Sequence, residues 1–275
     1  MKISIGLPTA LPGTPASIFV PWAQKAEQAG FAALGTIGRT VYDSYDELVV
    51  LAACAAVTSK IRLATTVLIA PPRETVLLAK QAASLQGISN GRFTLGLGVG
   101  WREDDFTVVG ADWSKRGVTL EKQIQRMHKI WQDREIGPTV QPPELLLGGA
   151  APAALERAGR LADAYMAGPF DTDEVIKYRD RVAEFAQKAQ RAVPRFLTSR
   201  YFALGDPTAI DKNIQRYFQV AGPEAIRQAR ANVLETPDDI RRIVAEHQAA
   251  GSDELCLWVQ SANLEQIDRL AEVVF

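Results

Sequence analysis

Histidine and cysteine are scarce in this chain of 275 residues, which has two of each. Neither His128 nor His247 has a cysteine or a carboxylate at the spacing of a metal site, and both fall in helical patterns away from the strand ends. We therefore expect no metal centre and no Ser-His-acid triad. Cys54 and Cys256 lie in apolar patterns typical of buried thiols, and two cysteines cannot form a disulfide framework, so we expect a reducing, cytoplasmic setting.

An excess of charge of either sign is also missing. Lys and Arg together number 31 and Asp and Glu 32, which leaves a formal net charge of −1. No global field attracts nucleic acid or an anionic membrane, and no apolar segment reaches the length of a membrane-spanning helix or takes the form of a signal peptide. We therefore expect a cytoplasmic protein whose partners are small molecules, not nucleic acid or membrane.

The 47% of hydrophobic residues is enough for one large core, and apolar strand patterns alternate with amphipathic helical patterns about eight times. The predicted strands are residues 2–7, 33–37, 61–70, 91–101, 145–147, 164–166, 196–204 and 254–260. This alternation predicts an α/β fold of the (β/α)8 TIM barrel type, with a single domain over residues 1–275. A doubly wound open sheet is the structural alternative.

The glycine-rich strand at 91–101 argues against that alternative. Gly96, Gly98 and Gly100 do not have the spacing of a dinucleotide fingerprint, and Trp101 with the acids after it would stand where a pyrophosphate has to lie. The same glycines clear one face of the strand, which suits a flat ligand or a narrow barrel interior that only glycine fits. Trp101 is either part of the ligand site or a packed lid.

A second small-residue stretch follows the strand at 145–147. Gly148 and Gly149 lead through Ala150 and Ala151 to Pro152, a typical first residue of a helix. Free N–H groups at a helix start, preceded by small residues, form an anion site. We therefore expect a phosphate group to bind here.

Catalytic groups of barrels lie on the loops that follow the strands, and this predicted mouth carries small, aromatic and cationic residues. They are Arg39, Thr65-Thr66, Gly98–Arg102, Gly148–Ala151 and Gly168-Pro169-Phe170. The set favours a planar, phosphate-bearing cofactor that supplies the chemistry while the protein orients it.

Arg39 is the one candidate for a direct catalytic part. A guanidinium at the end of the second strand can hold an anionic or carbonyl-bearing substrate, but it cannot shuttle protons near neutral pH. The alternative is a surface arginine paired with Asp43 or Asp46.

Several segments resemble the bacterial luciferase-like monooxygenases, and together they cover nearly the whole chain. They are residues 62–73, 78–85, 91–103, 116–117, 147–149, 160–163, 236–238 and 250–254. The resemblance implies a (β/α)8 barrel that binds FMN or the deazaflavin coenzyme F420 at the C-terminal mouth. It further implies a non-proline cis peptide at Thr66-Val67, against which the ring of the cofactor rests, and a phosphate loop at Gly148-Gly149-Ala150-Ala151. With Gly98, Gly100 and Trp101, these are the expected cofactor-binding residues.

The chain departs from the family pattern in three places. Gly38-Arg39 stands where relatives commonly have an acid followed by histidine, and residues 132–144 are shorter than the usual insertion before the fifth strand. Ala162-Asp163-Ala164-Tyr165 replaces a common Ala-Asp-Gly-Trp. Three functions remain open: a monooxygenase that uses reduced FMN and oxygen on an organic substrate, an F420-dependent hydride-transfer enzyme, and a cofactor-binding barrel without turnover.

The helical segment at 46–58 has more apolar perimeter than an outer barrel helix facing water needs. The resembling family also tends to dimerise through its early helices. We therefore expect a homodimer, with burial beneath a neighbouring loop as the alternative.

Overall fold

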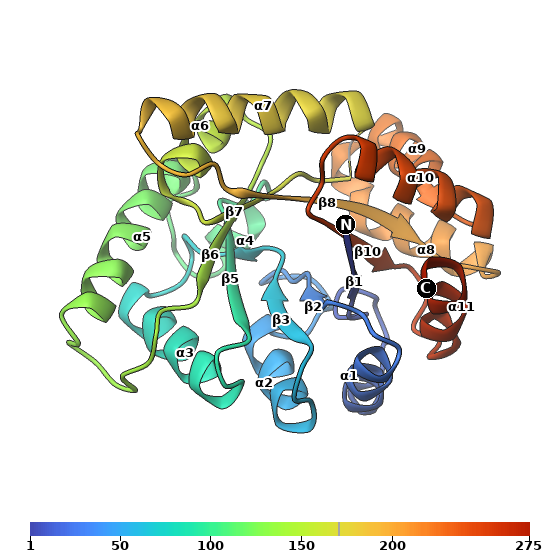
Figure 1. The fold of residues 1–275 in the computed structure, drawn as a ribbon, viewed down its shortest axis with the longest axis horizontal. Helices are drawn as coiled ribbons and strands as arrows, with labels where there is room; N and C mark the ends of the chain where they lie inside the picture. Colours follow the sequence, from blue (N-terminus) through green and yellow to red (C-terminus); the bar gives the residue numbers. More distant parts are fainter. Residues whose placement is uncertain (170) are drawn as a thin grey trace.

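Parallel strands close into a barrel in this computed structural model, which describes residues 1–169 and 171–275 (Figure 1). The barrel strands in chain order are β1 (Lys2–Gly6), β2 (Ala33–Thr36), β3 (Arg62–Thr65), β5 (Phe93–Gly98), β6 (Glu144–Gly148), β7 (Ala164–Met166), β8 (Arg195–Phe202) and β10 (Glu254–Val259). Each pairs in parallel with its neighbour, and β10 joins both β1 and β8, so the sheet has no free edge there. The expected (β/α)8 TIM barrel is confirmed.

Helices connect the strands and surround the barrel, as Figure 1 shows. The longer ones are α1 (Phe19–Gln28), α2 (Glu47–Val57), α3 (Thr75–Ile88), α5 (Arg116–Gln132), α6 (Pro152–Leu161), α7 (Thr172–Lys188), α8 (Pro207–Phe218), α9 (Pro223–Ala231), α10 (Pro237–Ala249) and α11 (Glu265–Val274). The short elements are α4 (Asp104–Thr107), the 3-10 turns η1 (Ala16–Ile18), η2 (Trp113–Lys115) and η3 (Gln219–Ala221), and the strands β4 (Leu68–Ile69) and β9 (Val233–Leu234).

Local sequence signals account for the helix starts. Asp46 caps α2 by accepting hydrogen bonds from the N–H groups of Leu48 and Val49. Thr236 and Asp239 form a reciprocal capping box at the start of α10.

One strand prediction needs correction, and one short strand was not predicted. The predicted strand at 61–70 is interrupted at Thr66-Val67. Before the break β3 pairs with both β2 and β5, and after it β4 pairs with β5. The two-residue strand β9, which pairs with β8, lies between helices and is too short for a period-two pattern to indicate it.

The core has two apolar clusters, one between strands and helices and one inside the barrel. Both cysteines are buried thiols, as expected, and burial raises the pKa of Cys54 to about 12. His247 lies buried on α10 and His128 lies exposed on α5, so both belong to the outer ring. Among the described residues, no helix combines the length and the apolar character needed to cross a membrane.

The N-terminal end of the barrel is closed by ion pairs between side chains of four strands. Arg195 binds both carboxylate oxygens of Glu144 at 2.9 Å, and Glu254 contacts Arg62 and Ser4. Burial alone would raise the pKa of Glu144, but the hydrogen bond and charge of Arg195 lower it overall. A ligand therefore has to approach the barrel from the opposite end.

Close packing of α6 on α7 gives a test of the fold. A Cβ atom at Gly159 would lie 2.7 Å from the carbonyl oxygen of Val182 and 2.8 Å from the amide nitrogen of Ala186. We expect Gly159→Ala to lower the free energy of unfolding by about 1–3 kcal/mol, because backbone atoms must move apart.

The matched control is Gly87→Ala, a change at an exposed helical glycine whose Cβ would meet Val140 at an ordinary 3.5 Å. It should be neutral or stabilise by up to about 1 kcal/mol, since alanine favours helix over glycine. Urea unfolding of both variants measures the difference. Equal effects would show that α6 and α7 do not pack as described.

Candidate active site

Val67 brings three strand ends together at the C-terminal mouth of the barrel. The Thr66-Val67 peptide is cis, as the resemblance implies. A Cβ atom at Gly98 would lie 2.5 Å from Cγ2 of Val67, and one at Gly148 would lie 3.1 Å from Cγ1. Both glycines therefore leave the space that the Val67 side chain fills, and the half-buried Val67 forms the surface between β5 and β6.

A glycine is needed at position 96 for a different reason. A Cβ atom there would lie 1.8 Å from the carbonyl oxygen of Thr65, and the Thr65 hydroxyl also bonds to the backbone of Gly96. This glycine permits close approach of β3 and β5 inside the barrel, so the steric interpretation holds at Gly96.

The expected phosphate loop is an exposed turn that ends at an uncapped helix. Gly149 has φ +132°, and its carbonyl oxygen accepts a hydrogen bond of 3.0 Å from the hydroxyl of Tyr165. Ala151 is the N-cap of α6 and provides no side-chain hydrogen bond, and Pro152 is the first helical residue. Pro152 has no N–H and the Ala154 N–H donates to the Ala151 carbonyl oxygen at 2.8 Å, so an anion here would meet the N–H of Ala153 and those of the preceding turn. Tyr165, one of the departures from the family pattern, therefore holds the turn in place.

Gly100 and Trp101 form the rim beyond β5. Gly100 has φ +69°, and a Cβ atom there would lie 2.8 Å from Ile69. Trp101 is 47% exposed, with the guanidinium of Arg102 5.5 Å from its ring centroid. Trp101 is thus not packed as a closed lid; its indole is accessible to a ligand.

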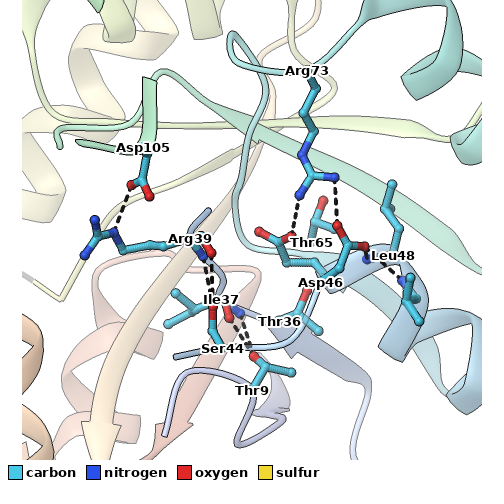
Figure 2. Close-up of polar contacts among 12 residues, drawn as sticks. Thr9, Thr36, Ile37, Arg39, Ser44, Asp46, Leu48, Thr65, Arg73 and Asp105 are labelled. Atoms are coloured by element: carbon cyan, nitrogen blue, oxygen red, sulfur yellow. Dashed lines mark hydrogen bonds and ion pairs between the residues drawn. The ribbon is translucent and has the colours of Figure 1, made fainter. Parts of the chain in front are cut away.

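Arg39 lies buried in an ion-pair cluster, and Figure 2 shows its contact with Asp105. Its Nε donates to Asp105 Oδ2 at 2.9 Å and its Nη2 to Asp104 Oδ1 at 2.8 Å. The Arg39 side chain is only 2% exposed and that of Asp105 is 0% exposed. Burial alone would lower the pKa of Arg39, but the hydrogen bond and charge of Asp105, with those of Asp104, raise it.

The alternative of a surface arginine paired with Asp43 or Asp46 is therefore wrong. Asp43 pairs with Arg216 at 3.4 Å and Asp46 with Arg73 at 2.9 Å. The true partner of Arg39 stands 66 positions away in the sequence, and only the parallel approach of the β2 and β5 exits brings it near.

The carboxylate of Glu47, which belongs to α2, fills the space that a side chain at position 38 would need. A Cβ atom at Gly38 would lie 2.5 Å from Cδ of Glu47, whose Oε2 accepts a hydrogen bond of 2.8 Å from Arg73. Burial raises the pKa of Glu47, with Arg73 acting in the opposite direction. The end of β2 thus has an acid beside it, but α2 supplies it.

An aromatic cavity occupies the other half of the mouth, and the sequence analysis did not find it. Tyr201, Tyr217, Phe218 and Trp258 line it, and its volume is about 30 Å³. The inward positions of Tyr201 on β8 and Trp258 on β10 follow from strand alternation, which could have indicated them. The position of α8 over the mouth has no such local signal.

Trp258 connects this cavity with the Val67 surface. A Cβ atom at Gly35 would lie 3.0 Å from both the Trp258 ring and the Thr66 hydroxyl. The two halves of the mouth therefore adjoin. Of the remaining candidates, Gly168 and Pro169 follow β7, and Phe170 lies outside the described residues. The described ranges contain no group of His, Cys, Asp or Glu side chains arranged to hold a metal ion.

The closed barrel of parallel strands defines a TIM-barrel protein, and the candidate site lies at the C-terminal mouth. The sequence model of the luciferase-like monooxygenase family matches residues 1–267. The chain belongs to this family.

Individual relatives are distant. An uncharacterized protein of Mycobacterium tuberculosis is 28% identical over 65% of this chain and 74% of its own length. The FMNH2-dependent dimethylsulfone monooxygenase of Pseudomonas fluorescens is 30% identical over 52% of this chain and 45% of its own length. An F420-dependent secondary alcohol dehydrogenase, solved with an F420-acetone adduct, has the same fold, with a TM-score of 0.81, 17% identity, and coverage of 100% of this chain and 98% of that one.

The buried pair of Arg39 and Asp105 gives a test of the site. Asp105→Asn leaves the guanidinium without its buried counter-charge, so we expect the free energy of unfolding to fall by about 3–5 kcal/mol. Asp104→Asn is the matched control, because the Asp104 side chain is 42% exposed and its loss should cost at most about 1 kcal/mol. Urea unfolding compares the two variants, and losses of similar size would contradict the buried arrangement.

Proposed function

We propose that the chain binds FMN, or as the second candidate F420, at the C-terminal mouth and acts as an oxidoreductase on a small organic molecule. The observation that carries this proposal is the meeting of Val67, Gly98 and Gly148 beside the uncapped start of α6. A flat apolar surface next to an anion site is what a planar cofactor with a phosphate tail requires. Reduced FMN, when bound, supplies the reaction with oxygen that makes such a barrel a monooxygenase.

Each part of the mouth has a role in this proposal. Val67 and Thr66 support the ring, Trp101 covers its edge, and the N–H groups of the turn at Gly148, Gly149, Ala150 and Ala151 bind the phosphate. Arg39 acts electrostatically: with Asp104 and Asp105 it holds the exits of β2 and β5 together, and its permanent charge does not move protons.

FMN is the first candidate because the family is described as monooxygenases and the relative from Pseudomonas fluorescens is named as FMNH2-dependent. F420 is the second because an F420-dependent dehydrogenase has the same fold. A cofactor-binding barrel without turnover is the third candidate, since Gly38-Arg39 provides no histidine at the mouth. We place the protein in a reducing, cytoplasmic compartment, where Cys54 and Cys256 stay thiols.

The first test measures the cofactor affinity of the Gly149→Val variant. Phosphate oxygens have to approach the Gly149 backbone, so this change should weaken FMN or F420 binding by about 1–3 kcal/mol while circular dichroism shows an intact fold. Gly30→Val is the control, because Gly30 also has positive φ, at +93°, but lies between α1 and β2 at the opposite end. Fluorescence titration with each cofactor measures the affinities. If the parent protein quenches neither compound, or both variants bind like the parent, the proposal fails.

We also propose that the chain forms a homodimer through α2. The exposed positions of this helix are Val49, Ala53 and Ala56, an apolar stripe at helical spacing, and Val49 is 69% exposed. Sedimentation at micromolar concentration should give twice the chain mass for the parent. Val49→Glu should give a monomer, whereas Lys60→Glu, an exposed change beyond the helix, should leave the dimer intact. A monomeric parent would rule the dimer out.

A further inference from the structure

The two cations of the Arg39 cluster are paired with carboxylates. Arg39 and Arg102 bind the carboxylates of Asp104 and Asp105, with Arg102 Nη2 at 2.6 Å from Asp104 Oδ2. The adjoining Arg73 is also paired, with Asp46 and Glu47, so these three guanidinium groups are already neutralised by carboxylates. An anionic ligand placed here would have to break one of these pairs.

The aromatic cavity beside this cluster has no charged lining residue in the described part of the chain. Its polar groups are neutral: Asn213, Gln260 and the hydroxyls of Tyr201 and Tyr217. Burial raises the pKa of Tyr217 to about 12, although Arg39 acts in the opposite direction, so its hydroxyl stays protonated at physiological pH. Moving an ion into contact with such a lining costs desolvation free energy, and no charged group here offsets that cost.

The rings of the cavity contact one another edge to face. Tyr217 and Phe218 have ring centroids 5.1 Å apart at 67°, and Tyr201 and Phe218 are 6.4 Å apart at 81°. Tyr42, which does not line the cavity, lies 5.5 Å from Tyr217 at 79°. Aromatic rings prefer this geometry. A planar ligand ring that replaces one of these side chains can make the same contacts.

The cavity is too small for a ligand as it stands. Its volume of about 30 Å³ is roughly the share of one water molecule, whereas small-molecule pockets hold about 300–1,000 Å³. Ile214, Tyr217 and Phe218, which fill the remaining space, all belong to α8. Room for a substrate therefore depends on the position of this helix.

The attachments of α8 to the barrel are few. Ile210 and Ile214 are buried, and Tyr217 and Phe218 are half-buried. Asn213 donates to the carbonyl oxygen of Gln260 at 2.7 Å, and the pair of Arg216 and Asp43 is exposed, so it adds little stability. Gly205 and Gly222 flank α8 and η3 with φ of +76° and +87°, conformations that suit hinge positions.

We propose that the substrate is an uncharged molecule with an aromatic ring, and that it enters when α8 swings outward on Gly205 and Gly222. The substrate ring then takes the place of Tyr217 among the remaining aromatic side chains, and Asn213 or Gln260 bonds to its polar group. This inference rests on the proposed function, because Trp258 places the cavity next to the Thr66-Val67 surface where the cofactor is proposed to bind.

The first experiment uses two ligands that share one ring and differ in charge. Calorimetric titration of the full chain, with and without FMN, compares naphthalene-2-carboxamide with naphthalene-2-carboxylate. The amide should bind at least about tenfold more tightly. Equal binding, tighter binding of the carboxylate, or no binding of the amide overturns the proposal.

A pair of variants on one helix tests the cavity. Tyr217→Ala vacates the space that the ligand ring takes, so it should tighten amide binding by about threefold or more. Gln215→Ala, at an exposed position of α8, should leave it unchanged. Unchanged or weaker binding by Tyr217→Ala would show that the ring binds elsewhere.

The movement of α8 is tested by fixing it. The double variant Asp43→Cys and Arg216→Cys has two exposed thiols that a short bis-maleimide can link, while Cys54 and Cys256 are buried. Linked protein should bind the amide at least about tenfold more weakly than the same protein without the linker, because the open state is removed. Equal affinities of the linked and unlinked protein would show that the amide does not need the outward movement of α8.

The results separate this inference from the proposed function. If FMN and F420 both fail to bind while the amide is preferred over the carboxylate, the proposed cofactor is wrong and the neutral aromatic site remains. If a cofactor binds but the two naphthalene ligands bind alike, the cofactor proposal stands and this inference is wrong.

Discussion

The packing of Val67 between Gly98 and Gly148 is the contact on which the mouth of this barrel depends. Close-packed interiors do not absorb an added methyl group without displacement, so a side chain at either glycine would push Val67 out of the mouth. Its neighbour Thr66 would move with it, away from Gly35 and the ring of Trp258. One small region thus determines both the surface beside the phosphate turn and the wall of the aromatic cavity.

Ion pairs lie at both ends of the barrel. Arg62, Arg195, Glu144 and Glu254 close the N-terminal end, and the cluster around Arg39 lies at the mouth. Because a buried charge is tolerated only with a partner, this arrangement leaves the interior between them apolar or neutral. The same pairing limits what the mouth can bind, since its guanidinium groups are already engaged.

Membership of the luciferase-like monooxygenase family and the departures from its pattern are compatible in this structure. Gly38 has no side chain because Glu47 fills that space, and Tyr165 holds the carbonyl of Gly149. The unusual residues therefore have structural partners of their own, and they alter the chemistry available at the mouth without disturbing the barrel.

The sequence alone predicted the barrel, most of its strands and the start of α6, because periodicity and helix-start signals act between residues close in the chain. It did not predict the break between β3 and β4 or the short strand β9. The cis peptide at Thr66-Val67 also followed from family resemblance. The partner of Arg39, the acid beside Gly38 and the position of α8 over the mouth were decided only by the tertiary structure. Asp105 is 66 positions from Arg39, and no local pattern records a contact that exists only because closure of the barrel brings two strand ends together.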